Sequence, residues 1–133
     1  YTMMQVCREL DMTYQTLKFY CNEGLVPNVK RDKNNRRIFD EKDVKWIHDL
    51  SCLKKCGMSI QEMKEYLALC LEGESTIKAR KEMLDKKQKA LREEIAELEK
   101  SIDYIDWKQN FYDDVLSGKR PYVSNLISAN ENE

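Results

Sequence analysis

The chain has 133 residues, of which 35% are charged and 41% hydrophobic. This length holds one compact domain, or a smaller domain followed by one long extended element, and it excludes two large domains. The high charged fraction suits helices with one solvated face better than a buried parallel sheet. We therefore expect an all-α protein with a small amount of β-strand.

Charge is distributed unevenly along the chain, although the formal net charge is only -1. Lys and Arg outnumber Asp and Glu by 12 to 10 in residues 1–70, whereas the acids are in excess by 14 to 11 in residues 71–133. Within the first part, residues 30–37 (KRDKNNRR) hold five basic groups and one acid. This local cluster is a more informative sign of nucleic-acid binding than the net charge.

No segment has the composition of a membrane span or of a cleaved signal peptide, so we expect a cytoplasmic protein without membrane contact. The number of cysteines is odd, and none of them form a zinc-type C-x-x-C pair, which argues against a secreted disulfide framework. We expect free thiols and no cofactor. The cysteines are Cys7, Cys21, Cys52, Cys56 and Cys70.

Two short helices open the chain. Thr2 with Gln5 three residues later is a capping box, and it predicts a first helix that ends near Asp11. Thr13 is the expected N-cap of a second helix, and Gly24 is its expected end. Two short helices separated by about two residues form a helix-turn-helix.

Residues 25–39 predict a β-wing. Two short extended stretches lie on either side of Asn34 and Asn35, and asparagine is favoured in turns. Two further helices follow, the third starting at Asp40 and the fourth opened by Ser59. These helices are expected to pack on the first two.

A single long helix is expected from residue 76 to about residue 116, because this stretch contains no Gly or Pro. At 1.5 Å per residue it is roughly 60 Å long, so it cannot fold back on a small domain. Apolar residues recur at every seventh position from Ile77 to Tyr112, which is typical of a coiled-coil seam between two chains. A second, offset row begins with Lys81 and Gln88 and becomes apolar later, at Ile95, Ile102 and Leu116.

Four stretches resemble the signature of the MerR family of regulators. TLKFY, NEGLVP, RRIFDEKDV and CGMSIQEM are similar in order and spacing to the family's Thr-Leu-Arg-Tyr-Tyr, Glu-Gly-Leu-Leu-Pro, Tyr-Arg-Leu-Tyr-Ser-Glu-Glu-Asp-Val and Gly-Met-Ser-Leu. The match covers about 70 of the 133 residues, and a long helix follows it as in the family.

The resemblance implies three parts. A winged helix-turn-helix domain is expected in residues 1–72, an antiparallel coiled-coil dimerisation helix in residues 75–117, and a tail in residues 118–133. In the tail, an apolar group is expected to dock on a helix before a disordered polar end. The group consists of Tyr122, Val123, Leu126 and Ile127.

The resemblance also implies which residues contact DNA. The second helix corresponds to the family's recognition helix, where Gln15 can bind an adenine edge and Lys18 a phosphate. The wing differs from the family pattern, since Asn35 and Arg36 stand in place of Gly-Tyr. The expected DNA-binding residues are Tyr14, Gln15, Thr16, Lys18, Tyr20, Lys33, Arg36 and Arg37.

The resemblance further implies a homodimer, formed through residues 76–116, that binds a palindrome in double-stranded promoter DNA. Regulators of this kind act where promoter elements are set too far apart, and they kink and untwist the DNA so that RNA polymerase can use the promoter. Sequence recognition then depends on DNA deformation as well as on base contacts.

The segment SCLKKCGMSI resembles the branch that responds to aldehydes and other thiol-reactive electrophiles, which makes Cys52 the candidate sensor thiol. Lys54, Lys55 and His48 would favour the reactive thiolate at a partly exposed site. Two alternatives remain: Cys52 as a small buried hydrophobe, and metal sensing by the stripe His48, Cys52 and Cys56. The outer two residues of this stripe lie roughly 12 Å apart along a helix, so one ion cannot bind all three and no metal site is predicted.

A second class of function is a coiled-coil adaptor that does not bind DNA, but the intact TLKFY segment and the basic wing favour a regulator. An enzyme is not expected, and no catalytic residue is assigned. The chain has one His, no assignable nucleophile and base, and no Gly-rich phosphate loop.

Overall fold

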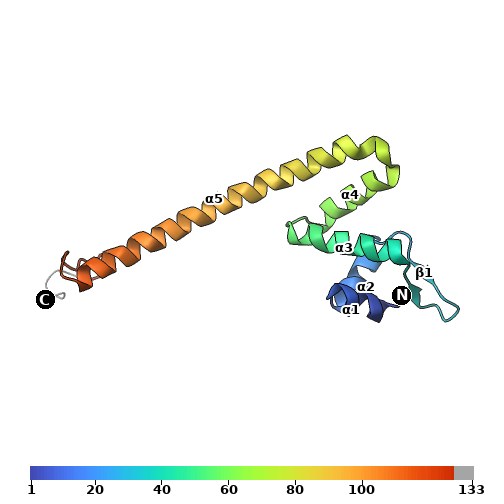
Figure 1. The fold of residues 1–133 in the computed structure, drawn as a ribbon, viewed down its shortest axis with the longest axis horizontal. Helices are drawn as coiled ribbons and strands as arrows, with labels where there is room; N and C mark the ends of the chain where they lie inside the picture. Colours follow the sequence, from blue (N-terminus) through green and yellow to red (C-terminus); the bar gives the residue numbers. More distant parts are fainter. Residues whose placement is uncertain (128–133) are drawn as a thin grey trace. The chain divides into compact units, whose positions relative to one another are not determined.

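The structure is a computed structural model that describes residues 1–127. The polar C-terminal end of the tail, for which disorder is expected, lies outside these residues. The chain divides into two units, Tyr1–Lys89 and Ala90–Glu133. Helices α1 to α4 and the wing belong to the first unit, which we call the head (Figure 1).

The helix-turn-helix consists of α1 (Met3–Leu10) and α2 (Tyr14–Asn22). The side chain of Thr2 accepts the Gln5 N–H and completes the predicted capping box, while Thr13 caps α2. Both caps satisfy backbone donors that a helix start leaves free. Local bonds therefore fix both starts as predicted.

The wing is a two-stranded antiparallel sheet of β1 (Lys30–Arg31) and β2 (Arg37–Ile38). At its turn Asn35 has a φ of 61°, the left-handed conformation that glycine adopts most easily and that asparagine tolerates. Asn35 thus fills the role of the family's glycine. An isolated bridge between Thr2 and Ile38 joins the wing to the start of α1.

Two helices follow the wing, α3 (Glu41–Lys55) and α4 (Ile60–Glu72). Asp40 and Ser59 cap them, each within a capping box. The core of the head contains side chains from all four helices and from the loops between them. Its largest fully buried members are Val6, Leu17, Leu25, Ile47, Leu50, Met58 and Met63.

A network of hydrogen bonds around the buried Thr76 joins α4 to α5, the next helix, through a short 3₁₀ turn (Glu74–Thr76). The hydroxyl of Thr76, a residue only 7% exposed, lies 2.6 Å from the Leu69 carbonyl oxygen and 2.8 Å from that of Gly73. Arg80 donates to the Gly73 carbonyl at 2.6 Å and to the Thr76 hydroxyl at 3.0 Å. These bonds fix the reversal of the chain between α4 and α5.

Helix α5 (Ile77–Leu116) has 40 residues, none of which is buried. Its seam is solvent-exposed in the single chain, with Leu98 at 64% and Ile102 at 56% exposure. Apolar side chains at heptad spacing along one helix are typical of a coiled-coil seam. None of the helices within residues 1–127 combines the length and apolar character needed to cross a membrane.

The tail differs from the expectation that its apolar group docks on a helix. Val123 is 64% exposed and Leu126 is 97% exposed, while Tyr122 and Ile127 are also exposed. The polar contacts of the turn, not these apolar side chains, hold the tail to α5. Arg120 forms an ion pair with Asp114 at 3.5 Å.

We predict that Thr76→Val lowers the free energy of unfolding by about 1–3 kcal/mol, because it keeps the shape of the side chain but removes a buried hydroxyl that bonds to two carbonyls and to Arg80. Urea unfolding measures the change. The neighbouring Ser75 is exposed and serves as the control, since Ser75→Ala should leave stability unchanged. If the two variants are equally stable, the hydrogen bonds of Thr76 do not stabilise the fold.

Candidate nucleic-acid interface

The outward face of α2 carries most of the residues expected to contact DNA. Tyr14 is 46% exposed, Gln15 and Lys18 are exposed, and Thr16 is half-buried. The hydroxyl of Thr13 bonds to that of Thr16 at 2.8 Å, which holds the first turn of this face in place. Polar groups suited to base edges and phosphates therefore line one side of the helix.

Tyr20 differs from the expectation that it is offered to DNA. It is 3% exposed, because it lies one helical turn after Leu17 and points into the same core. Burial raises the pKa of the Tyr20 phenol. We therefore remove Tyr20 from the candidate interface.

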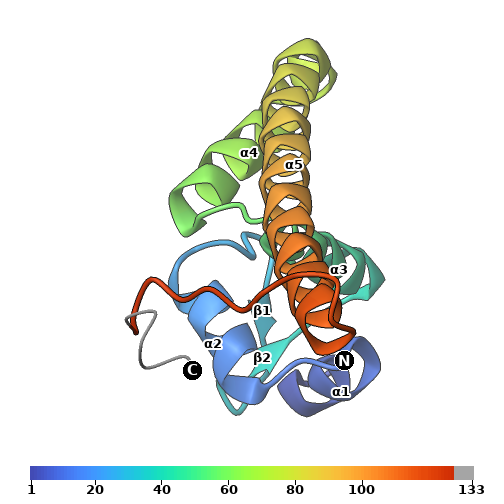
Figure 2. The same cartoon turned by 90° about the vertical axis from the view of Figure 1, so that its left-hand side faces the viewer.

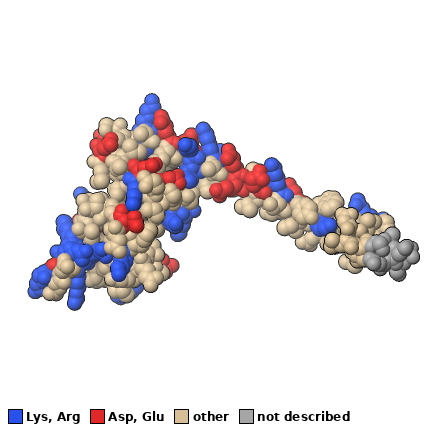
Figure 3. Space-filling model, turned by 180° about the vertical axis from the view of Figure 1, so that it is seen from behind, with Lys and Arg blue, Asp and Glu red and all other residues tan. Residues whose placement is uncertain are grey.

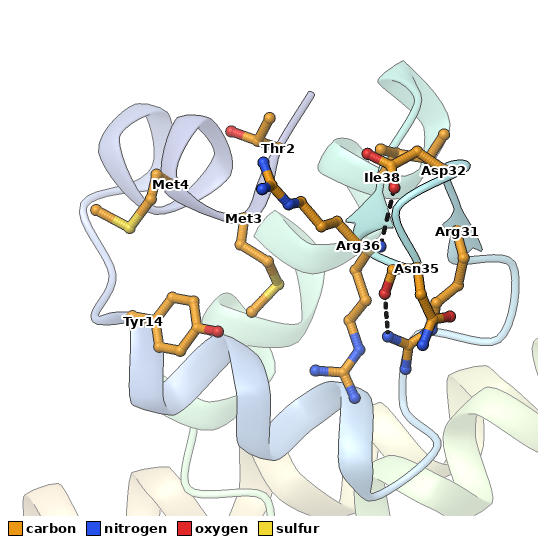
Figure 4. Close-up of a pocket in the computed structure, with 10 residues that line it drawn as sticks. Thr2, Met3, Met4, Tyr14, Arg31, Asp32, Asn35, Arg36 and Ile38 are labelled. Carbon is orange, nitrogen blue, oxygen red and sulfur yellow. Dashed lines mark hydrogen bonds between the residues drawn. The ribbon is translucent and has the colours of Figure 1, made fainter.

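The wing carries five basic residues, and its turn is held by its own hydrogen bonds. The Asp32 carboxylate accepts the backbone N–H groups of Asn34 and Arg36, both at 2.9 Å. The Arg31 guanidinium donates to the Asn35 carbonyl at 2.9 Å (Figure 4). Lys33 and Arg36 remain exposed.

An open cavity of about 530 Å³ lies between the start of α1, α2 and the wing. Figure 4 shows arginine side chains of the wing on one side of it and Tyr14 on the other. The cavity brings three of the predicted residues, Tyr14, Arg36 and Arg37, to one place. It is lined by Thr2, Met3, Met4, Tyr14, Arg31, Asp32, Asn35, Arg36, Arg37 and Ile38.

Two arginines stand directly opposite each other in the wing, since the register pairs Arg31 with Arg37. Like charges in this position repel, and an anion beside them relieves the repulsion. Figure 3 shows Lys and Arg side chains gathered at the lower left, where the wing lies after the half-turn from Figure 1. The wing is therefore well suited to contact a phosphate backbone.

A hydrogen bond joins the wing to the end of α2. The Arg37 guanidinium donates to the Asn22 side-chain oxygen at 2.7 Å. The same two arginines lie near Cys21, whose pKa is raised by burial although Arg37 and Arg31 act in the opposite direction. The wing and the recognition helix are thus in direct contact.

Cys52 lies on the exposed face of α3, which differs from the alternative that it is a buried hydrophobe. Its Sγ is 3.9 Å from the His48 Nε2 one turn earlier. Cys56 is also exposed, whereas Cys7 is buried. Within residues 1–127, no three His, Cys, Asp or Glu side chains are grouped closely enough to hold a metal ion.

The corner between α3 and α4 is tied to α5. The Lys87 ammonium lies 3.2 Å from the Glu62 carboxylate and 3.4 Å from the Gly57 carbonyl oxygen. The pKa of Glu62 is lowered below its usual range, mainly by the hydrogen bond from the Ser59 N–H and next by the hydrogen bond from Lys87. The chain segment after Cys52 is therefore connected to the long helix.

Sequence reasoning missed two residues of this surface. Arg31 lay within the predicted basic cluster but was not singled out, because only the strand register shows that it stands opposite Arg37. Asn22 carried no signal, since its partner is 15 positions away in the chain.

Comparison with known proteins identifies the family. Residues 1–70 match the model of the MerR HTH family regulatory protein, and residues 45–107 match the model described as MerR, DNA binding. An uncharacterized HTH-type transcriptional regulator of Haemophilus influenzae is 36% identical over 112 residues, which cover 84% of this chain and 83% of that protein. The HTH-type transcriptional regulator AdhR of Bacillus subtilis is 40% identical over 88 residues, 65% of this chain and 63% of AdhR.

Solved structures identify the same family. HiNmlR, described as a MerR family regulator lacking the sensor domain and bound to promoter DNA, superposes with a TM-score of 0.72 at 34% identity, covering 88% of this chain and 93% of that one. A putative MerR family transcriptional regulator from Listeria monocytogenes gives a TM-score of 0.77 at 29% identity, with 90% of each chain covered. The predicted winged helix-turn-helix with a long C-terminal helix is confirmed.

Both family models describe regulators, and the relatives are named as transcriptional regulators, so the prediction of a regulator and not an enzyme is also confirmed. The chain belongs to the MerR family of helix-turn-helix proteins and is a DNA-binding transcriptional regulator.

Proposed function

We propose that this regulator acts in the cytoplasm as a homodimer, binds a palindromic promoter operator and distorts it to control transcription by RNA polymerase. The observation that carries the proposal is that Tyr14, at the start of α2, and the arginines of the wing line one open cavity, while Arg37 also bonds to Asn22 at the end of α2. A helix of this kind fits the major groove, and basic side chains beside it fit the phosphates. The promoter-bound relative HiNmlR supports the same use of the fold.

The residues divide by role. We assign base contacts to Gln15 and Tyr14 on the exposed side of α2, because an amide can pair with an adenine edge. We assign phosphate contacts to Lys18 and the wing, whose charges supply binding energy without reading sequence. The wing residues are Arg31, Lys33, Arg36 and Arg37.

We predict that Arg37→Ala weakens binding to all duplex sequences by a similar factor and lowers the slope of log affinity against log salt by about 1. The measurement is fluorescence anisotropy with a short duplex selected by the wild-type protein from a random-sequence library. Lys119→Ala, an exposed change in the tail, is the control and should bind as the wild type does. Unchanged affinity of Arg37→Ala at every salt concentration would exclude Arg37 from the interface.

Dimerisation is proposed through the exposed seam of α5. The apolar row lacks a partner in the single chain, with Ile95 at 55% and Ile105 at 52% exposure. Charge along the helix supports an antiparallel arrangement. Residues 78–92 hold seven basic and two acidic groups, whereas residues 93–114 hold eight acidic and two basic ones. Antiparallel pairing sets the basic half of one helix against the acidic half of the other.

We predict that Ile102→Asp gives a monomer that no longer binds the palindrome tightly, because a carboxylate in the seam remains desolvated and unpaired. Sedimentation velocity measures the change of mass. Tyr104→Asp is the matched control, since Tyr104 is similarly exposed on the same helix but lies outside the seam. If Ile102→Asp stays dimeric, residues 76–116 are not the dimer interface.

Cys52 is proposed as the sensor of thiol-reactive electrophiles such as aldehydes. Its exposure allows a small carbonyl compound to reach the sulfur, and the nearby His48 Nε2 can accept the thiol proton in the appropriate tautomer. The sulfur then bonds to the carbonyl carbon while a proton passes to the carbonyl oxygen, which forms a hemithioacetal and requires no oxidant.

We predict that Cys52→Ser abolishes the response of promoter output to added formaldehyde or methylglyoxal but leaves DNA affinity unchanged. Transcription from the selected operator in vitro measures the response, and intact-mass spectrometry with peptide mapping locates the adduct. Cys56→Ser, a neighbouring exposed thiol, is the control and should respond normally. A full response by Cys52→Ser would exclude Cys52 as the sensor. If the wild type responds to neither compound, the signal is a metal or another small molecule. Absence of DNA binding by the wild type would favour a coiled-coil adaptor.

A further inference from the structure

The hydrogen bond between Arg37 and Asn22 is the side-chain bond that joins the two elements proposed to contact DNA. Asn22 is the last residue of α2, and Arg37 is the first residue of β2. The donor and acceptor atoms are 2.7 Å apart, the short distance expected when the donor is charged. Figure 2 shows the end of α2 and β2 near each other in the head.

The Arg37 side chain needs a partner to hold it in one place, although the bridge between Thr2 and Ile38 joins the backbone of the wing to the start of α1. Each strand has two residues, and a two-stranded sheet of this size is marginally stable in water. The cross-strand neighbour of Arg37 is Arg31, whose like charge repels it. Without a partner, the Arg37 side chain would therefore be free to swing away from the cavity.

We propose that Asn22 is a positioning residue for DNA binding, which holds the Arg37 guanidinium at the end of α2 so that the wing and the recognition helix meet DNA as one surface. The inference rests on the assignment of Arg37 to the DNA interface made above.

The chemistry of Asn22 suits this role better than that of a carboxylate. An amide oxygen accepts one N–H of the guanidinium and leaves its charge and its remaining donors available to a phosphate. A carboxylate would neutralise the charge. The end of α2 offers a further attraction, because a helix C-terminus favours a cation and the last turn of α2 contains no basic residue of its own.

An arginine side chain that is already held in place loses less conformational entropy when it binds DNA. Immobilising one flexible side chain at an interface weakens affinity by roughly two- to tenfold. We therefore expect Asn22→Ala to weaken DNA binding by roughly this factor and to leave the salt slope unchanged, since Arg37 still neutralises its phosphate once bound.

The test is a double-mutant cycle on the full chain with Asn22→Ala, Arg37→Ala and the double variant, titrated against the duplex selected by the wild-type protein. Asn28→Ala is the matched control, because Asn28 is exposed in the loop between α2 and β1. Thermal unfolding of each variant is measured in parallel. Asn22 is exposed, so its change should not alter the melting temperature.

The inference is supported if Asn22→Ala weakens binding in the wild-type background and has no further effect once Arg37 is Ala. It is overturned if Asn22→Ala has no effect, or if it weakens binding equally in both backgrounds, because Asn22 would then act on DNA or on folding without Arg37. An effect of Arg37→Ala without an effect of Asn22→Ala would overturn this inference alone. An inert Arg37→Ala would instead exclude Arg37 from the DNA interface.

Discussion

The burial of one side of α2 is the constraint on which the DNA surface depends. Leu17 and Tyr20, which lie one turn apart, are 0% and 3% exposed. Because an α-helix repeats every 3.6 residues, their burial directs Gln15 and Lys18 outward, while Tyr14, at the start of the helix, is 46% exposed. Rotating the helix to expose Tyr20 would withdraw Leu17 from the core, at an expected cost of about 1.5–3 kcal/mol for that side chain alone. The hydrophobic core thus selects the side chains that can reach DNA.

Local signals were sufficient to predict most of the fold. A capping side chain bonds to a backbone N–H three positions away, so its effect can be recognised within four residues, as at Thr13 and Ser59. The long helix was equally predictable, because a stretch without Gly or Pro and with a heptad repeat has few other stable forms. The turn at Asn35 was also predictable, since asparagine is favoured in turns and tolerates the positive φ found there.

The parts of the site that the sequence did not reveal depend on contacts between distant segments. The register that sets Arg31 opposite Arg37 follows from the length of the wing turn, and the bond from Arg37 to Asn22 spans 15 positions. Tyr20 was misplaced for a related reason. A tyrosine on a recognition helix can face either the core or the DNA, and its neighbour Phe19 is exposed. Only the packing of the core shows that Tyr20 is buried.

A series of polar contacts leads from the wing through the end of α2 and α4 to α5, and it starts with the bond from Arg37 to Asn22. Glu23 follows Asn22 at the end of α2 and bonds to Lys64 of α4 at 2.9 Å, while Glu62, on the same helix as Lys64, bonds to Lys87 of α5. Partly exposed pairs of this kind add little stability, so their main effect is on geometry. The Gly57 carbonyl, five residues after Cys52, approaches the same lysine. Under the proposed function, an adduct on Cys52 would therefore not need to approach DNA, because a shift of the corner between α3 and α4 would act on both ends of this path.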